Sequence, residues 1–334
     1  MKAVVLVGGF GTRLRPLTLT APKQMLPVLD RTMLEHVVGR LGSHGVDEVV
    51  LSLGYKEDIF RAAFPDGVCA GVALRYAVEP EPLDTAGAVR FAAEAAGIDE
   101  TFIVVNGDVF TDLDVTAVWN RHHEVGAEGT IALTPVDDPS RYGVVPTDLD
   151  GKVIGFVEKP PRDEAPTKWI NAGTYVLEPS VLRRIDTGRK VSIERETFPA
   201  IVADDGLWAV QSDAYWVDAG TPETYIQIQL DLVNGLRGGD WPAIAATATV
   251  ELGAEVEDSV VLDGAVIEGG AVVRNSVIST GARIGAGASV DGSIVGPDAR
   301  VHSWARLRNL TMLGDGAIAA SGEELDGVKR PESP

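Results

Sequence analysis

Short apolar runs alternate with amphipathic helical patterns over about the first 235 residues. The apolar runs have the length of buried strands and cover 3–7, 47–53, 72–78, 101–106 and 130–136. The helical patterns between them cover 33–45, 85–97 and 114–126. This alternation predicts an α/β fold with a mostly parallel sheet and helices on both faces. In such folds, ligands bind beyond the carboxyl ends of the strands.

The pattern changes after a linker at 236–242 that contains glycine and proline. Aliphatic residues then recur every six positions in three series separated by slips in phase: Val250, Val256, Leu262; Val266, Val272, Ile278, Ile284, Val290; and Val295, Val301, Leu307, Leu313. This period favours a parallel β-helix of hexapeptide repeats over an ordinary antiparallel β domain. We therefore predict a first domain at 1–235, a β-helix at 243–320 and a frayed polar tail at 321–334.

Composition narrows the choice of partners. The 334 residues carry 29 Lys and Arg against 49 Asp and Glu, a formal net charge of −20. A charge of this sign repels nucleic acid and anionic lipid, so we expect neither nucleic acid nor a membrane as a partner. The single cysteine, Cys69, cannot form an internal disulfide, and the apolar run at 3–7 is too short for a signal peptide or a membrane span. We expect a cytoplasmic protein.

A glycine-rich loop follows the first predicted strand and leaves backbone N–H groups accessible to a phosphate. Its glycines are Gly8, Gly9 and Gly11. The loop lacks the Lys-Ser/Thr pair of a P-loop, and Leu14 stands where the dinucleotide-binding fingerprint has its third glycine. Arg13 and Lys23 follow instead, and both can hold phosphate oxygens. We therefore expect a small phosphorylated ligand, bound by a local basic cluster.

Two aspartates stand at the ends of predicted strands. Asp108 follows the run TFIVVNG, and Asp218 lies in WVDAGTP. The helix after Asp218 is predicted to begin with Thr221 as its N-cap and Pro222 in its first turn. Carboxylates from two strand ends can hold Mg²⁺, which prefers oxygen ligands and also binds substrate phosphates.

Together these motifs resemble the signature of the sugar-1-phosphate nucleotidyltransferases, most strongly that of the mannose-1-phosphate guanylyltransferases. The similarity covers nearly the whole chain, through GGFGTRLRPLT, PK, NGD, YGVV, FVEKP, INAGTYVLEP, SIERETFPAIV and WVDAGTPETY. It implies a Rossmann-like nucleotidyltransferase domain followed by a left-handed β-helix. It also implies transfer of a nucleotidyl group from an NTP, with GTP favoured, to a sugar 1-phosphate such as mannose 1-phosphate, with Mg²⁺ as cofactor.

The resemblance assigns roles position by position. The catalytic residues would be Arg13, Lys23, Asp108 and Asp218, and the two aspartates would be the metal ligands. Nucleotide contacts would come from Gly8, Gly9, Gly11, Thr12, Arg13, Glu79, Thr85, Ala86 and Gly87. Sugar-phosphate contacts would come from Lys23, Gly143, Glu158, Lys159 and Asn171.

The segment EPEPLDTAGA departs from the family pattern, because Asp84 replaces a glycine. An acidic side chain beside the base could accept hydrogen bonds from guanine N1–H and the 2-amino group. Our hypothesis is that Glu79 or Asp84 favours guanine in this way.

Other functions stay open at this stage. A glucose or cyclitol 1-phosphate could replace mannose 1-phosphate. A non-catalytic regulatory homologue is disfavoured, because it would have no chemical need to keep the four charged residues Arg13, Lys23, Asp108 and Asp218. Acyltransferase chemistry in the β-helix would need a histidine base, for which His302 is the candidate. We expect the β-helix to mediate homo-oligomerisation, and His122 and His123 to be surface residues.

Overall fold

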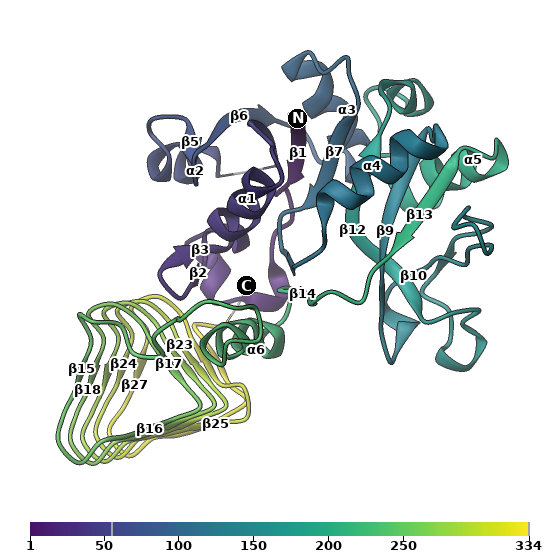
Figure 1. Ribbon diagram of the computed structural model, residues 1–334. Coiled ribbons are helices and arrows are strands. Elements are labelled where there is room, and N and C mark those ends of the chain that lie inside the picture. Colours follow the sequence, from purple (N-terminus) through teal and green to yellow (C-terminus); the bar gives the residue numbers. More distant parts are fainter. Residues whose placement is uncertain (55, 333–334) are drawn as a thin grey trace. The chain divides into compact units, whose positions relative to one another are not determined.

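The computed structural model describes residues 1–54 and 56–332, which divide into two compact units (Figure 1). The first unit consists of 1–9 and 34–216, and the second combines 10–33 with the chain from 217 onward. The loop segment that follows the first strand therefore groups with the β-helix.

A ten-stranded sheet forms the core of the first unit. Its central strands β7, β1, β4 and β6 are parallel, and β12 continues the sheet beside β7 in the antiparallel direction. The strands are β1 (Lys2–Leu6), β4 (Glu48–Leu53), β5 (Val68–Cys69), β6 (Val72–Val78), β7 (Phe102–Asn106), β9 (Gly129–Pro135), β10 (Gly143–Val144), β11 (Val157–Glu158), β12 (Trp169–Leu177) and β13 (Leu207–Gln211). The predicted parallel sheet is confirmed, with antiparallel strands in addition.

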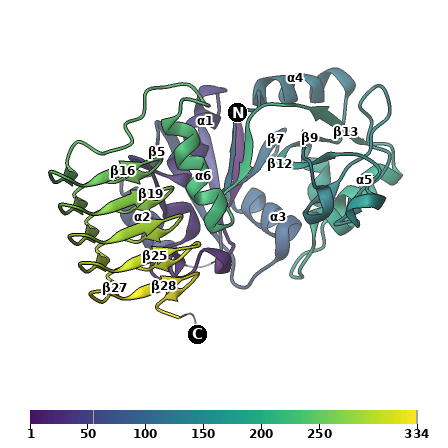
Figure 2. The ribbon, with the colours of Figure 1, turned by 90° about the horizontal axis from the view of Figure 1, so that it is seen from below.

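Helices cover both faces of this sheet, with α3 on one face and α4 on the other (Figure 2). The helices of this part of the chain are α1 (Met33–Ser43), α2 (Glu57–Ala63), α3 (Asp84–Ala96), α4 (Val115–Val125) and α5 (Phe198–Ala203). Small side chains let α3 approach the sheet closely, because Ala86, Ala92 and Ala93 are fully buried in one cluster with Val4 and Val104. In the described part of the chain, no helix combines the length and apolar character needed to cross a bilayer.

The predicted surface position of His122 is wrong. This side chain on α4 is only 1% exposed, and its ring nitrogens lie 2.9 Å from Thr130 Oγ1 and 3.0 Å from Glu178 Oε1. Burial lowers its pKa. The error arose because a histidine on an amphipathic helix looks polar in the sequence, although its two nitrogens can be satisfied inside the fold.

The segment 10–33 of the second unit folds as short 3₁₀ turns and a hairpin. The turns are Thr12–Leu14, Leu17–Leu19 and Lys23–Met25, and the hairpin is β2 (Pro27–Val28) with β3 (Arg31–Thr32). Helix α6 (Pro222–Val233) supports the hairpin, because Tyr225 and Gln229 hydrogen-bond to backbone atoms of residues 27 and 29 at 2.5 and 3.2 Å. As predicted, α6 begins with Thr221 as N-cap and Pro222 in the first turn.

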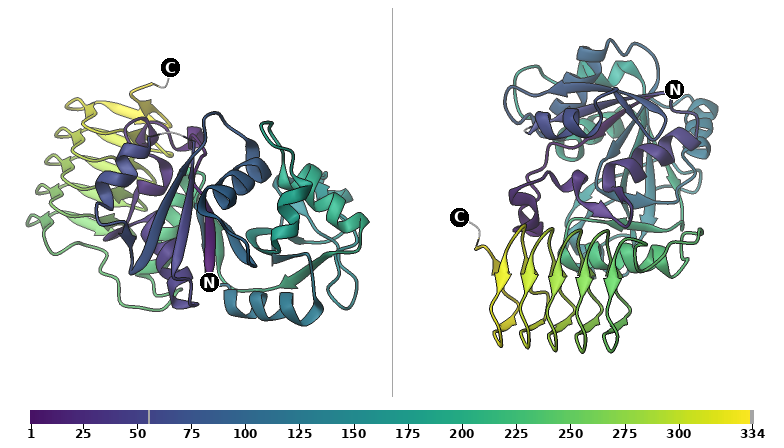
Figure 3. Two further views of the ribbon diagram at one scale, coloured as in Figure 1. Left: turned by 90° about the horizontal axis from the view of Figure 1, so that it is seen from above. Right: turned by 90° about the vertical axis from the view of Figure 1, so that its left-hand side faces the viewer.

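Three parallel five-stranded sheets stack into the predicted β-helix (Figure 3). The first contains β15 (Thr249–Val250), β18 (Val266–Ile267), β21 (Arg283–Ile284), β24 (Arg300–Val301) and β27 (Ile318–Ala319). The second contains β16 (Glu255–Glu257), β19 (Val272–Arg274), β22 (Ser289–Asp291), β25 (Arg306–Arg308) and β28 (Glu324–Asp326). The third contains β17 (Val260–Val261), β20 (Val277–Ile278), β23 (Ile294–Val295), β26 (Met312–Leu313) and β29 (Lys329–Arg330).

The slips in the six-residue period follow from the length of a coil. Equivalent residues of the early coils are 17 positions apart, one short of three hexads, so the phase slips once per coil. The strict six-residue series includes Val266 and Val272, which are half-buried, whereas the core of the β-helix contains their neighbours Ile267 and Val273.

The predicted polar tail at 321–334 is also wrong as far as Arg330, because β28 and β29 complete the last coil. Outward positions of a β-helix are polar, and in β28 only Leu325 turns inward and is buried. Arg330 closes the coil by pairing with both carboxylate oxygens of Glu323, at 2.7 and 3.0 Å. Residues 333–334 lie outside the described part.

A ladder of buried hydroxyls links successive coils. Ser259 Oγ accepts from Ser276 N at 3.1 Å, and Ser276 Oγ accepts from Ser293 N at 3.0 Å. The Ser276 hydroxyl also donates to Arg274 O at 2.5 Å. Each hydroxyl therefore satisfies a backbone N–H at a corner where the strand ladder is interrupted.

We predict that Ser276→Ala lowers the free energy of unfolding by about 1–3 kcal/mol, because it leaves the buried Ser293 N–H without its acceptor. Urea unfolding of the full chain measures this loss. Ser279→Ala is the control, since Ser279 is also buried but its hydroxyl is not part of the ladder. Equal losses in the two variants would show that the ladder is not what stabilises the stack.

Candidate active site

Lys23 packs against the turn at Gly11 that precedes Arg13. Gly11 has φ +59° and caps the 3₁₀ turn that contains Arg13. A Cβ on Gly11 would lie 3.2 Å from Lys23 Cβ and 3.0 Å from Thr18 Cγ2. Glycine is therefore required at this position both for the left-handed backbone and for the close packing. Lys23 is buried along its stem, whereas Arg13 and Thr12 are exposed.

The Arg13 guanidinium lies beside the Asp218 carboxylate, with Nη2 and Oδ2 3.8 Å apart. Asp218 ends strand β14 (Trp216–Asp218), and Gly220 follows in the turn before α6. A side chain at Gly220 would overlap the guanidinium and lie 2.8 Å from Asp218 Oδ1. With side-chain exposures of 61% and 28%, this pair contributes at most about 1 kcal/mol. Replacing this ion pair by an Arg13–phosphate contact and an Asp218–cation contact therefore costs little free energy.

Gly8, Gly9 and Asp108 lie at the carboxyl ends of adjacent strands in the first unit. Gly8 follows β1 and packs on Gly54, where a Cβ would come within 3.1 Å of Gly8 O. A Cβ on Gly9 would meet nothing within 4 Å. Asp108 stands in the turn between β7 and β8 (Val109–Thr111), next to Gly107, whose N donates to Leu6 O at 2.9 Å. The predicted strand-end position of Asp108 is confirmed.

The structure gives Glu79 and Asp84 different environments. Glu79 is buried, and its carboxylate accepts from Ser52 Oγ at 3.0 Å and from Leu83 N at 2.9 Å. It therefore holds the turn before α3. Asp84 is exposed and has φ +61°, a left-handed conformation that aspartate tolerates better than most residues. This backbone geometry explains why glycine suits the same position in the family.

Thr85, Ala86 and Gly87 pack against the segment 189–193. Thr85 Oγ1 accepts from Ile193 N at 2.9 Å, and the N–H groups of Ala86 and Gly87 donate to Val191 O at 2.9 and 3.3 Å. These groups anchor the start of α3. Their contact with a nucleotide stays a prediction.

Four of the five predicted sugar-phosphate residues lie on or next to β10, β11 and β12, whereas Lys23 belongs to the second unit. Gly143 pairs with Glu158 across β10 and β11, and a Cβ on Gly143 would lie 3.3 Å from Glu158 Oε2 and strike the Phe156 ring. Lys159 Nζ lies 3.2 Å from Glu158 Oε1. Asn171 on β12 is buried, and its Nδ2 donates to Tyr175 OH at 2.8 Å.

Glu194 completes this cluster and was missed as a site residue in the sequence. Asn171 Nδ2 donates to Glu194 Oε1 at 2.7 Å. Burial, reinforced by the nearby charge of Glu158, raises the pKa of the Glu194 carboxyl. Glu194 lies in a π-helical turn, Ile193–Thr197, a distortion that often occurs at functional sites. No sequence signal separated it from Glu196, which is exposed two residues later.

Asp108 and Asp218 have the chemistry of magnesium ligands. Among the described residues, no three His, Cys, Asp or Glu side chains converge as a complete metal site. Mg²⁺ in nucleotide-dependent enzymes commonly takes only one or two carboxylates and completes its shell with phosphates and water. Each aspartate could therefore supply one carboxylate to such an ion, with the substrate supplying further oxygens.

We predict that Glu194→Gln becomes more stable relative to the native chain as pH rises above about 4.5. Because the pKa of Glu194 is raised in the fold, the folded state holds this proton more tightly than the unfolded chain. Stability is therefore lost as pH rises through the folded pKa, and glutamine avoids that loss while still accepting from Asn171. Thermal unfolding between pH 4.5 and 8 measures the difference.

Glu196→Gln is the matched control with the opposite sign. Its hydrogen bond with Arg189 lowers the pKa of Glu196, so this carboxylate stabilises the fold above its unfolded pKa. The Glu196→Gln variant should therefore be less stable than the native chain by a nearly constant amount between pH 4.5 and 8, because the contribution of this carboxylate is lost only as pH falls below about 4.5. Parallel pH profiles for the two variants would contradict the assignment.

In comparisons with known proteins, both parts of the chain match family models. Residues 2–235 match the Nucleotidyl transferase family model, and residues 240–325 match the GMPPB C-terminal domain model. The chain is 41% identical over 287 residues to the mannose-1-phosphate guanylyltransferase of Mycobacterium tuberculosis, a match that spans 79% of each protein. It is 43% identical over 230 residues to the mannose-1-phosphate guanyltransferase of Aspergillus fumigatus, across 68% of this chain and 62% of that protein's length.

Solved structures agree with this assignment. The crystal structure of HddC from Yersinia pseudotuberculosis superimposes with a TM-score of 0.60 at 30% identity, covering 69% of this chain and 99% of HddC. The same protein complexed with GMP-PN superimposes with a TM-score of 0.59. The chain therefore belongs to the nucleotidyl transferase family.

Proposed function

We propose that this protein transfers GMP from GTP to mannose 1-phosphate, forming GDP-mannose and pyrophosphate. The observation that carries the proposal is the 41% identity with the Mycobacterium tuberculosis mannose-1-phosphate guanylyltransferase over 79% of both proteins. The HddC complex with GMP-PN, at 30% identity, adds support for a guanine nucleotide as ligand.

The reaction needs no dedicated base. A phosphate oxygen of mannose 1-phosphate is ionised at neutral pH and attacks the α-phosphorus of GTP, while the bond to the β-phosphate oxygen breaks and pyrophosphate leaves. Catalysis can therefore rest on positioning and on neutralisation of charge. In this proposal Arg13 binds the β- and γ-phosphates, and Lys23 binds the sugar phosphate and the charge that develops at the α-phosphate. The weak Arg13–Asp218 pair supports it, because both partners can be released for ligands.

Asp108 and Asp218 would hold Mg²⁺. When bound, the ion would supply Lewis-acid charge that offsets the negative charge of the phosphate oxygens. In this proposal the two carboxylates would hold the ion, and Arg13 would bind the β- and γ-phosphates.

The cluster around Asn171 would bind the sugar. Glu158 and Glu194 offer carboxylate oxygens to mannose hydroxyls, and Lys159 offers an ammonium to the sugar phosphate. The hydrogen bond from Asn171 Nδ2 to Glu194, at 2.7 Å, holds this acceptor in place before the substrate arrives, and Asn171 also donates to Tyr175 OH at 2.8 Å.

A cytoplasmic location and homo-oligomeric assembly belong to the same proposal. Cys69 is the only cysteine, and burial raises its pKa to about 12, so this thiol is unreactive and fits a reducing compartment. The stacked coils of the β-helix end in strand edges that favour association. Cell fractionation and light scattering test these two points.

We predict that Lys23→Ala and Asp218→Ala each reduce pyrophosphate release from GTP and mannose 1-phosphate at least about 100-fold. A coupled assay for pyrophosphate measures the rate. Lys190→Ala and Asp213→Ala are the matched controls, because both side chains are exposed in the first unit. Turnover near that of the controls would refute the assigned roles.

We predict that Asp84→Gly lowers the ratio of GTP to ATP turnover about tenfold, because the exposed carboxylate would no longer accept from the guanine edge. Asp84→Asn should lower the ratio less, since asparagine keeps one acceptor and tolerates the left-handed backbone. Glu79→Gln should leave the ratio unchanged, because Glu79 holds Ser52 and the Leu83 N–H. An unchanged ratio in Asp84→Gly would sink the hypothesis.

A further inference from the structure

The segment that carries Arg13 contacts the β-helix within the second unit. Lys329 Nζ, on the last strand β29, donates to Arg13 O at 3.0 Å. Three residues further along the segment, the buried Pro16 packs against Gly314, which follows strand β26 at a corner of the coil. A Cβ on Gly314 would lie 3.0 Å from Pro16 Cβ. The backbone of the segment is therefore held on both sides of Arg15.

Lys329 breaks the pattern of its sheet. The register of the third sheet aligns it with four aliphatic residues that are fully buried, Val260, Val277, Ile294 and Met312. The repeat therefore predicts another aliphatic residue in the fifth coil. A lysine stands there instead, in the coil from which its ammonium reaches the carbonyl of Arg13.

The coil corners show a second break in the repeat. The residues that follow the strands of the third sheet occupy equivalent positions, because their N–H groups donate to the next coil at 2.7–2.9 Å. They are Leu262, Ser279, Gly296 and Gly314. The corner thus changes from residues with side chains to glycine at Gly296 and Gly314. At Gly296 the backbone of the next coil already excludes a Cβ, which would lie 2.5 Å from Leu313 O, and Leu17 Cδ2 of the Arg13 segment would be 3.1 Å away.

A special backbone conformation does not explain Gly314. Its φ lies outside the left-handed region, so other residues could adopt this backbone. The atoms nearest to a Cβ at this position are side-chain carbons of Pro16, at 3.0 and 3.2 Å, followed by Pro331 Cδ at 3.3 Å. The glycine is therefore explained by the close approach of the segment.

We propose that the last three coils of the β-helix position Arg13 for the triphosphate, with Lys329 and Gly314 as the positioning residues. Lys329 fixes the carbonyl of Arg13, and Gly314 lets Pro16 seat against the coil. The guanidinium is then held at the Asp218 corner, 3.8 Å from the carboxylate. The β-helix thereby becomes part of the nucleotide site. This inference rests on the proposed role of Arg13 in binding GTP.

The test measures the Kd of GTP with Mg²⁺ by calorimetry on the full chain, without sugar phosphate so that no turnover occurs. Lys329→Met, which restores the aliphatic pattern of the repeat, should raise Kd about three- to tenfold. Gly314→Ala should raise it by a similar factor, and Lys329→Arg should stay within about twofold of the native value.

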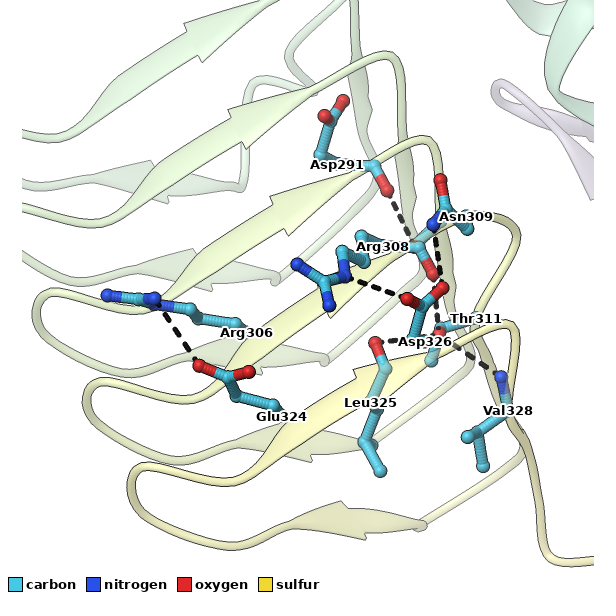
Figure 4. Close-up of polar contacts among 10 residues, drawn as sticks. Asp291, Arg306, Arg308, Asn309, Thr311, Glu324, Leu325, Asp326 and Val328 are labelled. Atoms are coloured by element: carbon cyan, nitrogen blue, oxygen red, sulfur yellow. Dashed lines mark hydrogen bonds and ion pairs between the residues drawn. The ribbon is translucent and has the colours of Figure 1, made fainter.

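Arg308→Met is the matched control. It removes a long cationic side chain from the neighbouring coil, where Arg308 Nε donates to Asp326 Oδ2 at 3.0 Å on the second sheet (Figure 4). It should change Kd by less than about twofold. Melting temperatures of all variants show whether the β-helix is intact. If Lys329→Met and Gly314→Ala fold and bind GTP as Arg308→Met does, the positioning role is wrong.

Coupling to Arg13 separates positioning from general stability. In an Arg13→Ala background, Lys329→Met should raise Kd by less than about twofold, because the group that it positions is gone. An undiminished effect in that background would overturn the inference. If Arg13→Ala alone binds GTP as tightly as the native chain, the proposed role of Arg13 fails. If Arg13→Ala weakens binding while Lys329→Met and Gly314→Ala do not, only the positioning role fails.

Discussion

The contact between the Arg13 guanidinium and the Asp218 carboxylate lies at the centre of this account. A chain with a net charge of −20 must bind a substrate that is itself strongly anionic, so it needs a locally placed cation. In the free protein Asp218 neutralises that cation, at a separation of 3.8 Å. Gly220 leaves the space in which both groups lie, because a Cβ there would overlap the guanidinium and lie 2.8 Å from Asp218 Oδ1.

Two parts of the second unit support the contact between Arg13 and Asp218. Helix α6 begins directly after the Asp218 turn with a capping box, which fixes the carboxylate side. Coils of the β-helix contact the arginine side through Lys329 and Gly314. A stack of coils cross-linked by buried hydroxyls is a rigid support, and rigidity is what a charge-positioning site requires.

Much of the fold could be predicted from hydrophobic periodicity, because strand-length apolar runs and a six-residue period both report buried faces. The exact core positions of the coils could not be predicted in this way, since each early coil is 17 residues long and a strict six-residue period does not fit that length. The last coil was mistaken for a tail because only Leu325 turns inward in its first strand. For the site, motif spacing located Arg13, Asp108 and Asp218 correctly at turns and strand ends.

Sequence could not show which polar groups are already used inside the fold. The nucleotide contact of Glu79 stays a prediction, but the sequence could not show that both of its oxygens accept hydrogen bonds from the protein itself. Glu194 looked like one charge among several, yet a π-helical turn directs it to Asn171. The most direct test of the proposed function is a pyrophosphate-release screen that crosses five nucleoside triphosphates with a panel of sugar 1-phosphates. We predict the highest kcat/KM for GTP with mannose 1-phosphate, and a higher value for any other pair, or no release at all, would contradict this function.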